Sequence, residues 1–371
     1  MILHLTREIK KGFTMETIRL GLIGCGGMMS THVIGVKYVE HVEIVAVCDI
    51  IEEKAQKVAD ALGGTAKVFT KYVDMVDMVD AVMIALPHDL HFECGMFFAM
   101  NNKHILMEKP LCNTERECEI LIETCEARHL KLMCAYPVRF WPGIRKLKEL
   151  IDSGEYGEII QMSVWTEQLT GANIRYDDPT GHQVWSLTGR LGGGQLFSHG
   201  CHYVDLLLWF LGNPISGSHM GTRNGTPWML REGTSALVMK FENGAVAYHG
   251  ATWGARGTRM GYDFQIQTEK AMLEYDHSLG EVREYNGNGI HKPGHSESKS
   301  YNILWTREGK ASKETQYEIS HFVDCVLHDK TPLTNGRAAL QGLRVIWKLY
   351  NAEENNMIAD LRGLGLEEVS E

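Results

Sequence analysis

Short apolar segments alternate with helix-like segments over the first third of this 371-residue chain. The apolar segments are residues 17–23, 42–48, 79–86, 104–107 and 131–135. Strands that alternate with helices form parallel sheets, and strands that are apolar almost throughout are typical of sheets covered on both faces. This part of the chain is therefore predicted to be an α/β domain built on a doubly wound parallel sheet.

The pattern changes after Phe140. Residues 142–154 predict a helix that ends at Gly154, and residues 158–169 are rich in β-branched and aromatic residues, which favours a longer strand. Four further strands are predicted, separated by Gly, Asn and Glu turns: 235–241, 245–253, 261–268 and 271–276. Residues 286–306 are predicted to be a loop, and helices are expected at about 313–327 and 337–352. The second half is therefore an α+β domain with an antiparallel sheet.

A glycine-rich turn, "GLIGCGGMMSTH", lies where the first strand passes into the first helix. Gly24 and Gly26 occupy the first two positions of G-x-G-x-x-G, which allow a tight turn and the approach of a pyrophosphate to the helix N-terminus. Met29 stands at the third position, so the motif is incomplete. Asp49 ends the second strand, where a carboxylate binds the adenosine ribose. Ile50 and Ile51 follow it without an arginine for a 2′-phosphate, so NAD is predicted in preference to NADP.

Charge and cysteine content restrict the partners and the compartment. Lys and Arg number 37 against 47 Asp and Glu, and the net charge of −10 disfavours nucleic acid and anionic membranes. Nine cysteines occur without a C-x-x-C pair, which suits a reducing cytoplasm. No apolar run approaches the roughly 20 residues of a membrane span. A second methionine, Met15, precedes the first strand, and we expect translation to begin there.

Five motifs occur in the order in which one enzyme family carries them: "GLIGCGGM", "ALPHDLH", "EKP", "GGGQLFSHGCHYVD" and "HFVDCVLHDKTPLTNGRAAL". On these motifs the chain resembles the glucose–fructose oxidoreductase, inositol dehydrogenase and rhizopine-catabolism family, written Gfo/Idh/MocA. The resemblance implies an N-terminal Rossmann domain, a C-terminal domain with an open, mostly antiparallel sheet, and a tightly held nicotinamide cofactor. It also implies a homo-oligomer, as a dimer, tetramer or larger assembly.

The same resemblance divides the chain and assigns residues. Residues 1–15 are an extension, 16–138 the dinucleotide-binding domain and 139–371 the substrate-binding and oligomerisation domain, with its last helices expected against the first domain. The cofactor is expected at Gly24, Gly26, Gly27, Met28, Met29, Asp49, Leu86, Pro87, His91, Glu108 and Lys109. The family's motif lysine falls on Lys109 and its catalytic histidine on His202. Family members carry Asp four residues before that histidine, but this chain has Ser198, which leaves His199, Tyr203 or a substrate group to replace the carboxylate.

Elementary chemistry gives Lys109 and His202 the same roles. Oxidation of a secondary alcohol removes a hydroxyl proton and a hydride from one carbinol. An imidazole can accept the proton, and a cation stabilises the negative charge that develops on the alkoxide oxygen. A lysine at the C-terminal end of a parallel strand projects toward the crevice where such sheets bind ligands. The predicted activity is NAD-dependent oxidation or reduction of a secondary hydroxyl of a sugar, glycoside or cyclic polyol, for example to a 3-keto sugar.

Other interpretations remain open for the same residues. A metal site would use His199, His202, Asp205 and Cys201, but Gly200 interrupts the set and no second ligand cluster occurs, so no metal is predicted. A glycosidase that works through transient oxidation, and a dinucleotide sensor without catalysis, are alternative functions. The expected substrate contacts are Arg139, Trp165, Trp185, Ser198 and His199, with Trp253 as a further stacking candidate.

Overall fold

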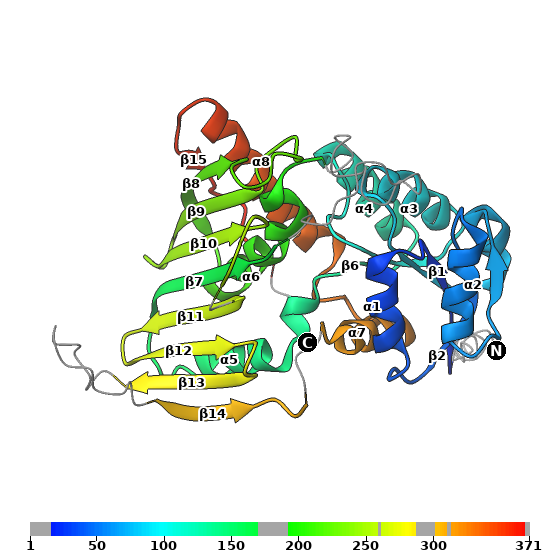
Figure 1. Cartoon of the computed structure of the whole chain (residues 1–371), viewed down its shortest axis with the longest axis horizontal. Coiled ribbons are helices and arrows are strands. Elements are labelled where there is room, and N and C mark those ends of the chain that lie inside the picture. The colour runs from blue at the N-terminus through cyan, green and yellow to red at the C-terminus, as the bar shows by residue number, and fades with distance from the viewer. Residues whose placement is uncertain (1–15, 170–191, 259–260, 287–300, 310–312, 368–371) are drawn as a thin grey trace, which may run out of the picture.

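A computed structural model describes residues 16–169, 192–258, 261–286, 301–309 and 313–367, which form two sheets with helices between and around them (Figure 1). The expected extension 1–15, Met15 and most of the predicted loop 286–306 lie outside the described residues. No helix within the described ranges is long and apolar enough to cross a membrane.

The first sheet is parallel and six-stranded, in the order β3-β2-β1-β4-β5-β6. Its strands are β1 (Ile18–Ile23), β2 (Val42–Cys48), β3 (Lys67–Phe69), β4 (Ala81–Ile84), β5 (His104–Met107) and β6 (Leu132–Cys134). This order confirms the doubly wound fold. The sequence did not indicate β3, because it has three residues and none of them is fully buried.

Helices cover both faces of this sheet, as the apolar strands require. They are α1 (Gly27–Val36), α2 (Glu52–Ala61), α3 (His91–Met100) and α4 (Glu115–Ala127), with the short 3₁₀ helices η1 (Tyr72–Met78) and η2 (His88–Leu90). One apolar cluster includes Met29 and Val33 of α1, and a second includes Phe98 of α3 and Leu121 of α4. Each face of the sheet therefore has its own core.

The second sheet has nine strands in the order β14-β13-β12-β11-β7-β10-β9-β8-β15. The strands are β7 (Ile159–Glu167), β8 (Pro214–Thr222), β9 (Thr234–Phe241), β10 (Val246–Thr252), β11 (Tyr262–Thr268), β12 (Ala271–Asp276), β13 (Glu281–Asn286), β14 (Asn302–Thr306) and β15 (Ala359–Asp360). Among the described strand pairs of this second sheet, only β7–β10 is parallel, which confirms a mostly antiparallel sheet. β14 corrects the end of the predicted loop 286–306, because four of its five residues pair with β13.

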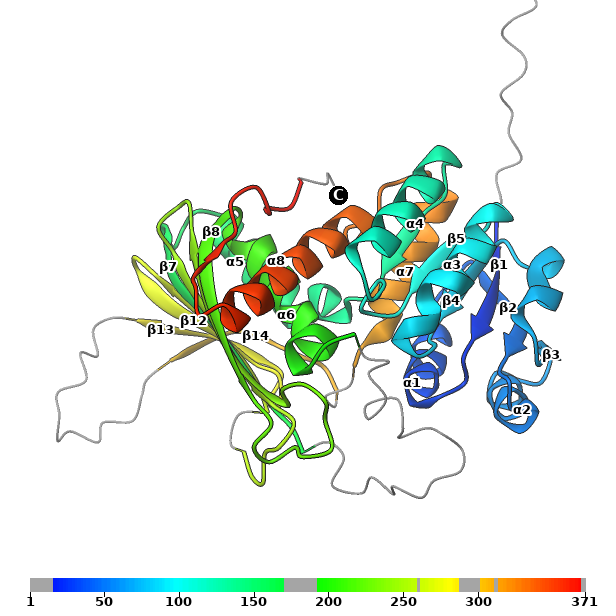
Figure 2. The same cartoon turned by 90° about the horizontal axis from the view of Figure 1, so that it is seen from above.

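Helices cover one face of the second sheet, and no helix of the described residues lies on the opposite face, as Figure 2 shows. The helices of this half are η3 (Pro137–Phe140), α5 (Pro142–Asp152), the π-helical turn η4 (Leu196–Gly200), α6 (Cys201–Leu211) and α8 (Gly336–Glu354). Every residue of α6 except Trp209 is buried. α6 therefore lies in the middle of the domain, and the side chains at its first turn are held rigidly.

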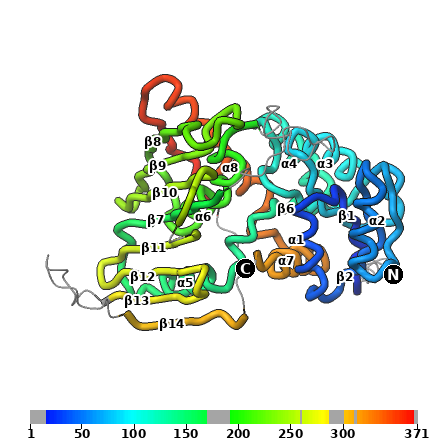
Figure 3. The backbone as a smooth tube through the Cα atoms, viewed as in Figure 1, coloured from blue at the N-terminus to red at the C-terminus, as the bar shows by residue number. Residues whose placement is uncertain are grey.

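The chain returns to the first domain before it ends (Figure 3). Helix α7 (Thr315–Leu327) packs on α1, where a Cβ on Gly35 would lie 2.3 Å from Thr315 Oγ1. The segment before α8 lies beside β6: Cys134 N–H donates to Thr334 O at 2.8 Å. The first domain therefore contains structure from both ends of the chain.

A buried ion pair joins η3 to α6. Arg139 donates through Nε and Nη2 to the two carboxylate oxygens of Asp205, at 2.6 and 2.8 Å, and through Nη1 to Leu333 O at 3.2 Å. Arg139 is 3% exposed and Asp205 is fully buried. Burial raises the pKa of Asp205, and the charge and hydrogen bonds of Arg139 oppose that effect.

Arg139→Met should lower the free energy of unfolding by about 3–5 kcal/mol, because it leaves a carboxylate buried without its cation. Arg337→Met is the matched control, since Arg337 pairs with Glu126 at 2.6 Å on the surface and such pairs contribute at most about 1 kcal/mol. Urea denaturation of both variants measures the difference. Equal losses in the two variants would contradict a structural role for the buried pair.

Candidate active site

The glycine turn between β1 and α1 is shaped to receive an anionic group. Gly24 has a φ of +85°, and a Cβ there would lie 2.4 Å from Ala85 O, so only glycine fits. A Cβ on Gly27 would have no other atom within 4 Å, so the space beside this glycine is open. The N-terminus of α1 has no side-chain cap and no acidic residue in its first turn. Its backbone N–H groups therefore fit the pyrophosphate of a dinucleotide.

Met28 and Met29 follow this turn with different surroundings. Met29, at the third glycine position, is fully buried in the core beneath α1. Met28 is half-buried and stays near the surface of the turn. The incomplete motif thus keeps its two functional glycines and uses the third position for packing.

Asp49 lies at the C-terminal end of β2, beside the glycine turn. Its Oδ2 accepts from Cys25 N–H at 2.8 Å and its Oδ1 accepts from Ile51 N–H at 2.9 Å. A carboxylate has about four acceptor sites, so each oxygen can accept a further hydrogen bond, as ribose hydroxyls would require. The side chain of Ile50 is 88% exposed beside it.

The loop after β4 lies against the glycine turn, but one of its predicted residues has a structural role. Leu86 and Pro87 are half-buried there, and Leu86 Cδ2 would lie 3.1 Å from a Cβ on Gly24. His91 is fully buried, with Nδ1 2.8 Å from Pro110 O and Nε2 2.9 Å from Leu86 O. Both ring nitrogens face backbone carbonyls, so the His91 side chain links two loops, and its contact with the cofactor stays a prediction.

Glu108 is likewise directed into the protein. Its Oε1 lies 2.7 Å from His32 Nε2, and its Oε2 accepts from Lys109 N–H at 3.1 Å. His32 Nδ1 lies 3.7 Å from Oε1 of Glu318, a fully buried residue of α7. Three elements, α1, the loop after β5 and α7, thus meet at titratable groups, and the Glu108 carboxylate is directed to His32 in this structure while its contact with the cofactor stays a prediction.

The two carboxyl groups of this cluster differ in protonation. Burial opposes ionisation of Glu108, but the hydrogen bond and charge of His32, with Lys109 and Lys313, outweigh it and lower the pKa to about 2. Burial, and then the negative charge of Glu108, hold the pKa of Glu318 well above its usual range. Glu108 is therefore a carboxylate at neutral pH, and Glu318 keeps its proton to a higher pH than an ordinary glutamate does.

Lys109 connects the two domains. It lies two residues after the end of β5, and its Nζ donates to Ser198 O in η4 at 3.0 Å. The lysine is thus held by the backbone carbonyl of Ser198, the residue at which family members carry Asp. One hydrogen bond occupies one of three N–H groups, and two are left to donate to a ligand.

The turn that carries Ser198 and His199 is fixed from the opposite side. Tyr350 of α8 donates to Glu232 Oε1 at 2.6 Å and accepts from the N–H groups of Gly194 and Phe197. Glu232 Oε1 also accepts from Leu196 N–H at 3.1 Å. These bonds satisfy the backbone of a π-helical turn, a geometry that is frequent at functional sites.

His202 lies in the first turn of α6, among aromatic rings. Its ring is 5.4 Å from that of Tyr136, which follows β6, and 5.7 Å from that of His199. Burial, followed by the positive charges of Lys109, His199 and Lys313, lowers the pKa of His202 well below its usual range. Its Nδ1 is buried without a hydrogen-bond partner among the described residues. His202 is therefore a neutral imidazole within the field of Lys109.

His199 and Tyr203 complete this group without replacing the missing carboxylate. Burial and the charge of Lys109 lower the pKa of His199 well below its usual range. Burial raises the pKa of Tyr203 well above its usual range, so its hydroxyl keeps its proton. The His199 ring contacts Trp253 and Tyr262, at 6.2 and 6.3 Å, which places an aromatic surface beside the imidazoles.

Two predicted substrate residues lie elsewhere, and one falls outside the described residues. Arg139 is occupied by Asp205 and Leu333, which corrects its expected substrate contact. Trp165 packs over Gly250 on the outer face of the second sheet, because His249, the neighbour of Gly250, contacts Tyr203 on the inner face. The indole is 38% exposed there and faces away from His199. Trp185 lies outside the described residues.

Lys313 is a charged residue that sequence reasoning missed at this site. It precedes α7, about 200 residues beyond Lys109, and its charge acts on Lys109, His199 and His202. No motif surrounds it, and only the return of α7 to the first domain brings it here. The sequence signal available was the closing family motif, which predicts that return but not its starting residue.

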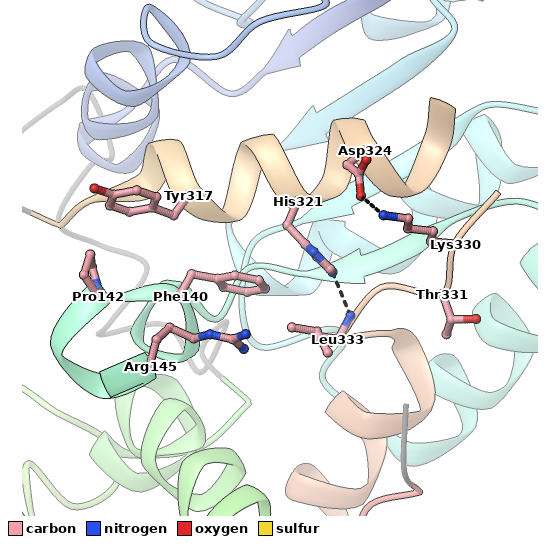
Figure 4. Close-up of a pocket in the computed structure, with 9 residues that line it drawn as sticks. All are labelled: Phe140, Pro142, Arg145, Tyr317, His321, Asp324, Lys330, Thr331 and Leu333. Atoms are coloured by element: carbon pink, nitrogen blue, oxygen red, sulfur yellow. Dashed lines mark hydrogen bonds and ion pairs between the residues drawn. The ribbon is translucent and has the colours of Figure 1, made fainter. Parts of the chain in front are cut away.

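Two further features of this region are its possible metal ligands and a separate cavity. In the described part of the chain, no three His, Cys, Asp or Glu residues are grouped so as to hold a metal ion. A cavity of about 380 Å³ lies between α5, α7 and the segment before α8 (Figure 4). Within it, His321 Nε2 accepts from Leu333 N–H and Lys330 pairs with Asp324. Neither Lys109 nor His202 lines this cavity.

Comparisons with known proteins agree with this geometry. Residues 18–136 match the model described as an oxidoreductase family with an NAD-binding Rossmann fold, and residues 144–274 match the GFO/IDH/MocA C-terminal domain. The chain is 24% identical to D-xylose 1-dehydrogenase (NADP(+)) 2 of Haloferax volcanii over 92% of this chain and 99% of that enzyme. It is 33% identical to inositol 2-dehydrogenase of Salmonella typhimurium over 38% of this chain and 44% of that enzyme. The fold resembles levoglucosan dehydrogenase with NADH and L-sorbose, at a TM-score of 0.81 and 18% identity over 94% and 99% of the two chains.

Glu318→Gln should change the free energy of unfolding by less than about 1 kcal/mol, because burial and Glu108 favour the uncharged form of this carboxyl group, which an amide imitates. Glu108→Gln should cost about 3–5 kcal/mol, because it removes the ionised partner of His32. Urea denaturation at pH 7 compares the two variants. A loss in Glu318→Gln as large as that in Glu108→Gln would show that both carboxyl groups are ionised.

Proposed function

The chain belongs to the Gfo/Idh/MocA oxidoreductase family, and we propose that it uses NAD to oxidise or reduce a secondary hydroxyl of a sugar, glycoside or cyclic polyol. The observation that carries this proposal is the hydrogen bond from Lys109 Nζ to Ser198 O. It brings an ammonium group of the first domain to the turn of the second domain that holds His199 and His202.

Each residue has a defined part in the proposed reaction. His202, neutral at pH 7, accepts the hydroxyl proton, and the two free N–H groups of Lys109 donate to the same oxygen and stabilise negative charge on it. When bound, a nicotinamide dinucleotide supplies the acceptor for the hydride. The Ser198 carbonyl and the Tyr350–Glu232 bonds keep the ammonium and the imidazole in a fixed relation.

Asp49 and Ile50 support NAD as the cofactor. The carboxylate of Asp49 has acceptor capacity for ribose hydroxyls, and its negative charge would repel a 2′-phosphate. Ile50 offers no positive charge beside it. The aromatic surface of Trp253 and Tyr262 next to His199 supports a carbohydrate or cyclic polyol as substrate, since indole faces suit the apolar faces of such rings.

The uncovered face of the second sheet supports a homo-oligomer. Trp165 and Val238 lie on adjoining parts of that face and are 38% and 43% exposed. All nine cysteines are free and buried, as suits the reducing cytoplasm proposed for this enzyme.

Lys109→Met and His202→Asn should each lower kcat/KM by about 10²–10⁴-fold, because each removes one of the groups that act on the hydroxyl. A panel of sugars, inositols and glycosides, followed through nicotinamide absorbance with products identified by mass, measures turnover and the position of the new ketone. Lys330→Met, which alters an exposed cation paired with Asp324, is the control and should retain wild-type rates.

The pH profile adds a second readout to the same variants. Because the pKa of His202 is lowered, the imidazole is already a base at pH 6.5, and kcat/KM for oxidation should stay level from pH 8 to below 6.5. Full activity in either Lys109→Met or His202→Asn would remove that residue from the mechanism.

The wild-type enzyme should prefer NAD to NADP by at least about tenfold in kcat/KM, equivalent to about 1.4 kcal/mol. The double variant Asp49→Ser, Ile50→Arg should reverse or abolish that preference, because it exchanges a negative charge for a positive one beside the ribose. Initial rates with both cofactors test this, and thermal unfolding checks that the variant is folded. A wild-type preference for NADP would contradict the role given to Asp49.

A further inference from the structure

Lys313 is held in place by its backbone. Its carbonyl accepts from Trp141 Nε1 at 2.9 Å, and the Trp141 ring is stacked on His277 at 4.1 Å. The next residues begin α7 on the surface of α1, where Thr315 Oγ1 donates to Thr31 O at 3.4 Å and no side chain fits at Gly35. The start of α7 therefore has little freedom to move relative to α1.

This anchoring directs the Lys313 side chain over the glycine turn. Its Nζ lies 3.2 Å from Met28 Sδ, in the first turn of α1. A thioether is a weak acceptor and carries no charge. The ammonium thus lies beside the backbone N–H groups that are oriented toward an anion, yet it contacts only a sulfur atom there.

Lys313 and Lys109 are two neighbouring cations whose charges are offset only at longer range, by the Glu108 carboxylate, which is itself hydrogen-bonded to His32. Neither Nζ lies within ion-pair distance of a carboxylate in the described part of the chain. Desolvation by the surrounding protein, and then the charge of Lys109, lower the pKa of Lys313, although the residue keeps solvent-exposed surface. Two like charges held together are unfavourable until an anion joins them, so the arrangement is suited to a ligand with negative charge.

We infer that Lys313 binds the pyrophosphate of the dinucleotide, so that the C-terminal half of the chain supplies part of the cofactor site. The inference rests on the proposed dinucleotide chemistry and extends it to a residue outside the Rossmann domain. A carboxylate or phosphate on the substrate would offer the same charge, but Lys313 reaches the turn at the N-terminus of α1, which favours the cofactor. Lys313, at the start of α7, lies beside that turn although it is far from it in the sequence.

The test is direct binding of NADH, ADP-ribose and adenosine to wild type, Lys313→Met and Lys313→Arg, measured by calorimetry. Lys313→Met should raise the Kd of NADH and of ADP-ribose by about tenfold or more, and the Kd of adenosine should stay constant because it lacks phosphate. Lys313→Arg should restore most of the affinity. The rise in the Kd of NADH with ionic strength should be less steep in Lys313→Met than in wild type. Lys330→Met, an exposed lysine of the cavity in Figure 4, is the matched control.

The possible outcomes separate this inference from the proposed function. An unchanged Kd for NADH in Lys313→Met overturns it, as does a loss confined to the KM of acidic sugars at saturating NAD. Because binding is measured without turnover, an enzyme that oxidises no sugar in the panel would overturn the substrate proposal and leave the Lys313 result valid. Thermal unfolding of Lys313→Met confirms that it is folded.

Discussion

The hydrogen bond between Lys109 and Ser198 joins two independent sheets at the place where chemistry is proposed. Lys109 is fixed by the end of β5, and Ser198 is fixed by a π-helical turn whose backbone is held by Glu232 and Tyr350. Since each partner belongs to a rigid core, the distance between ammonium and imidazole is set by the packing of whole domains. Such positioning is the main means by which a protein assists a hydride transfer whose electronic demands are met by a cofactor.

The titratable groups beneath the site form pairs that differ in how readily their carboxyl groups ionise. Glu108 is ionised beside His32, while burial and the charge of Glu108 raise the pKa of Glu318. Arg139 and Asp205 form a separate pair below α6. The ammonium groups of Lys109 and Lys313 have no such partner within the described ranges. Positive charge is therefore left available on the side that faces the glycine turn and His202, and the same charge keeps His202 in its basic form.

Local patterns predicted the fold well, and they predicted the site in part. The alternation of apolar strands and helices gave the parallel sheet, and the motifs placed Lys109 and His202 near each other, because both lie at the ends of regular elements. The direction in which a side chain points was harder to predict. His91 and Glu108 belong to cofactor motifs but turn inward to backbone and to His32. Side chains along β7, including Trp165, alternate between the two faces of the sheet. The alternation alone does not indicate which face is covered by helices. Lys313 depends on a contact between segments some 280 residues apart (Met28 and Lys313), which no local pattern encodes.

The packing of α7 on α1 has a consequence for how the chain matures on the ribosome. Ile319, Phe322 and Val323 belong to the same apolar cluster as Met29 and Val33. A nascent chain that has finished β6 has made all six parallel strands but cannot yet close this cluster. One side of the first domain stays uncovered through the synthesis of the entire second sheet, a period in which exposed apolar surface is open to wrong association. The order of synthesis and the order of completion therefore differ, and the domain that begins first is among the last to be sealed.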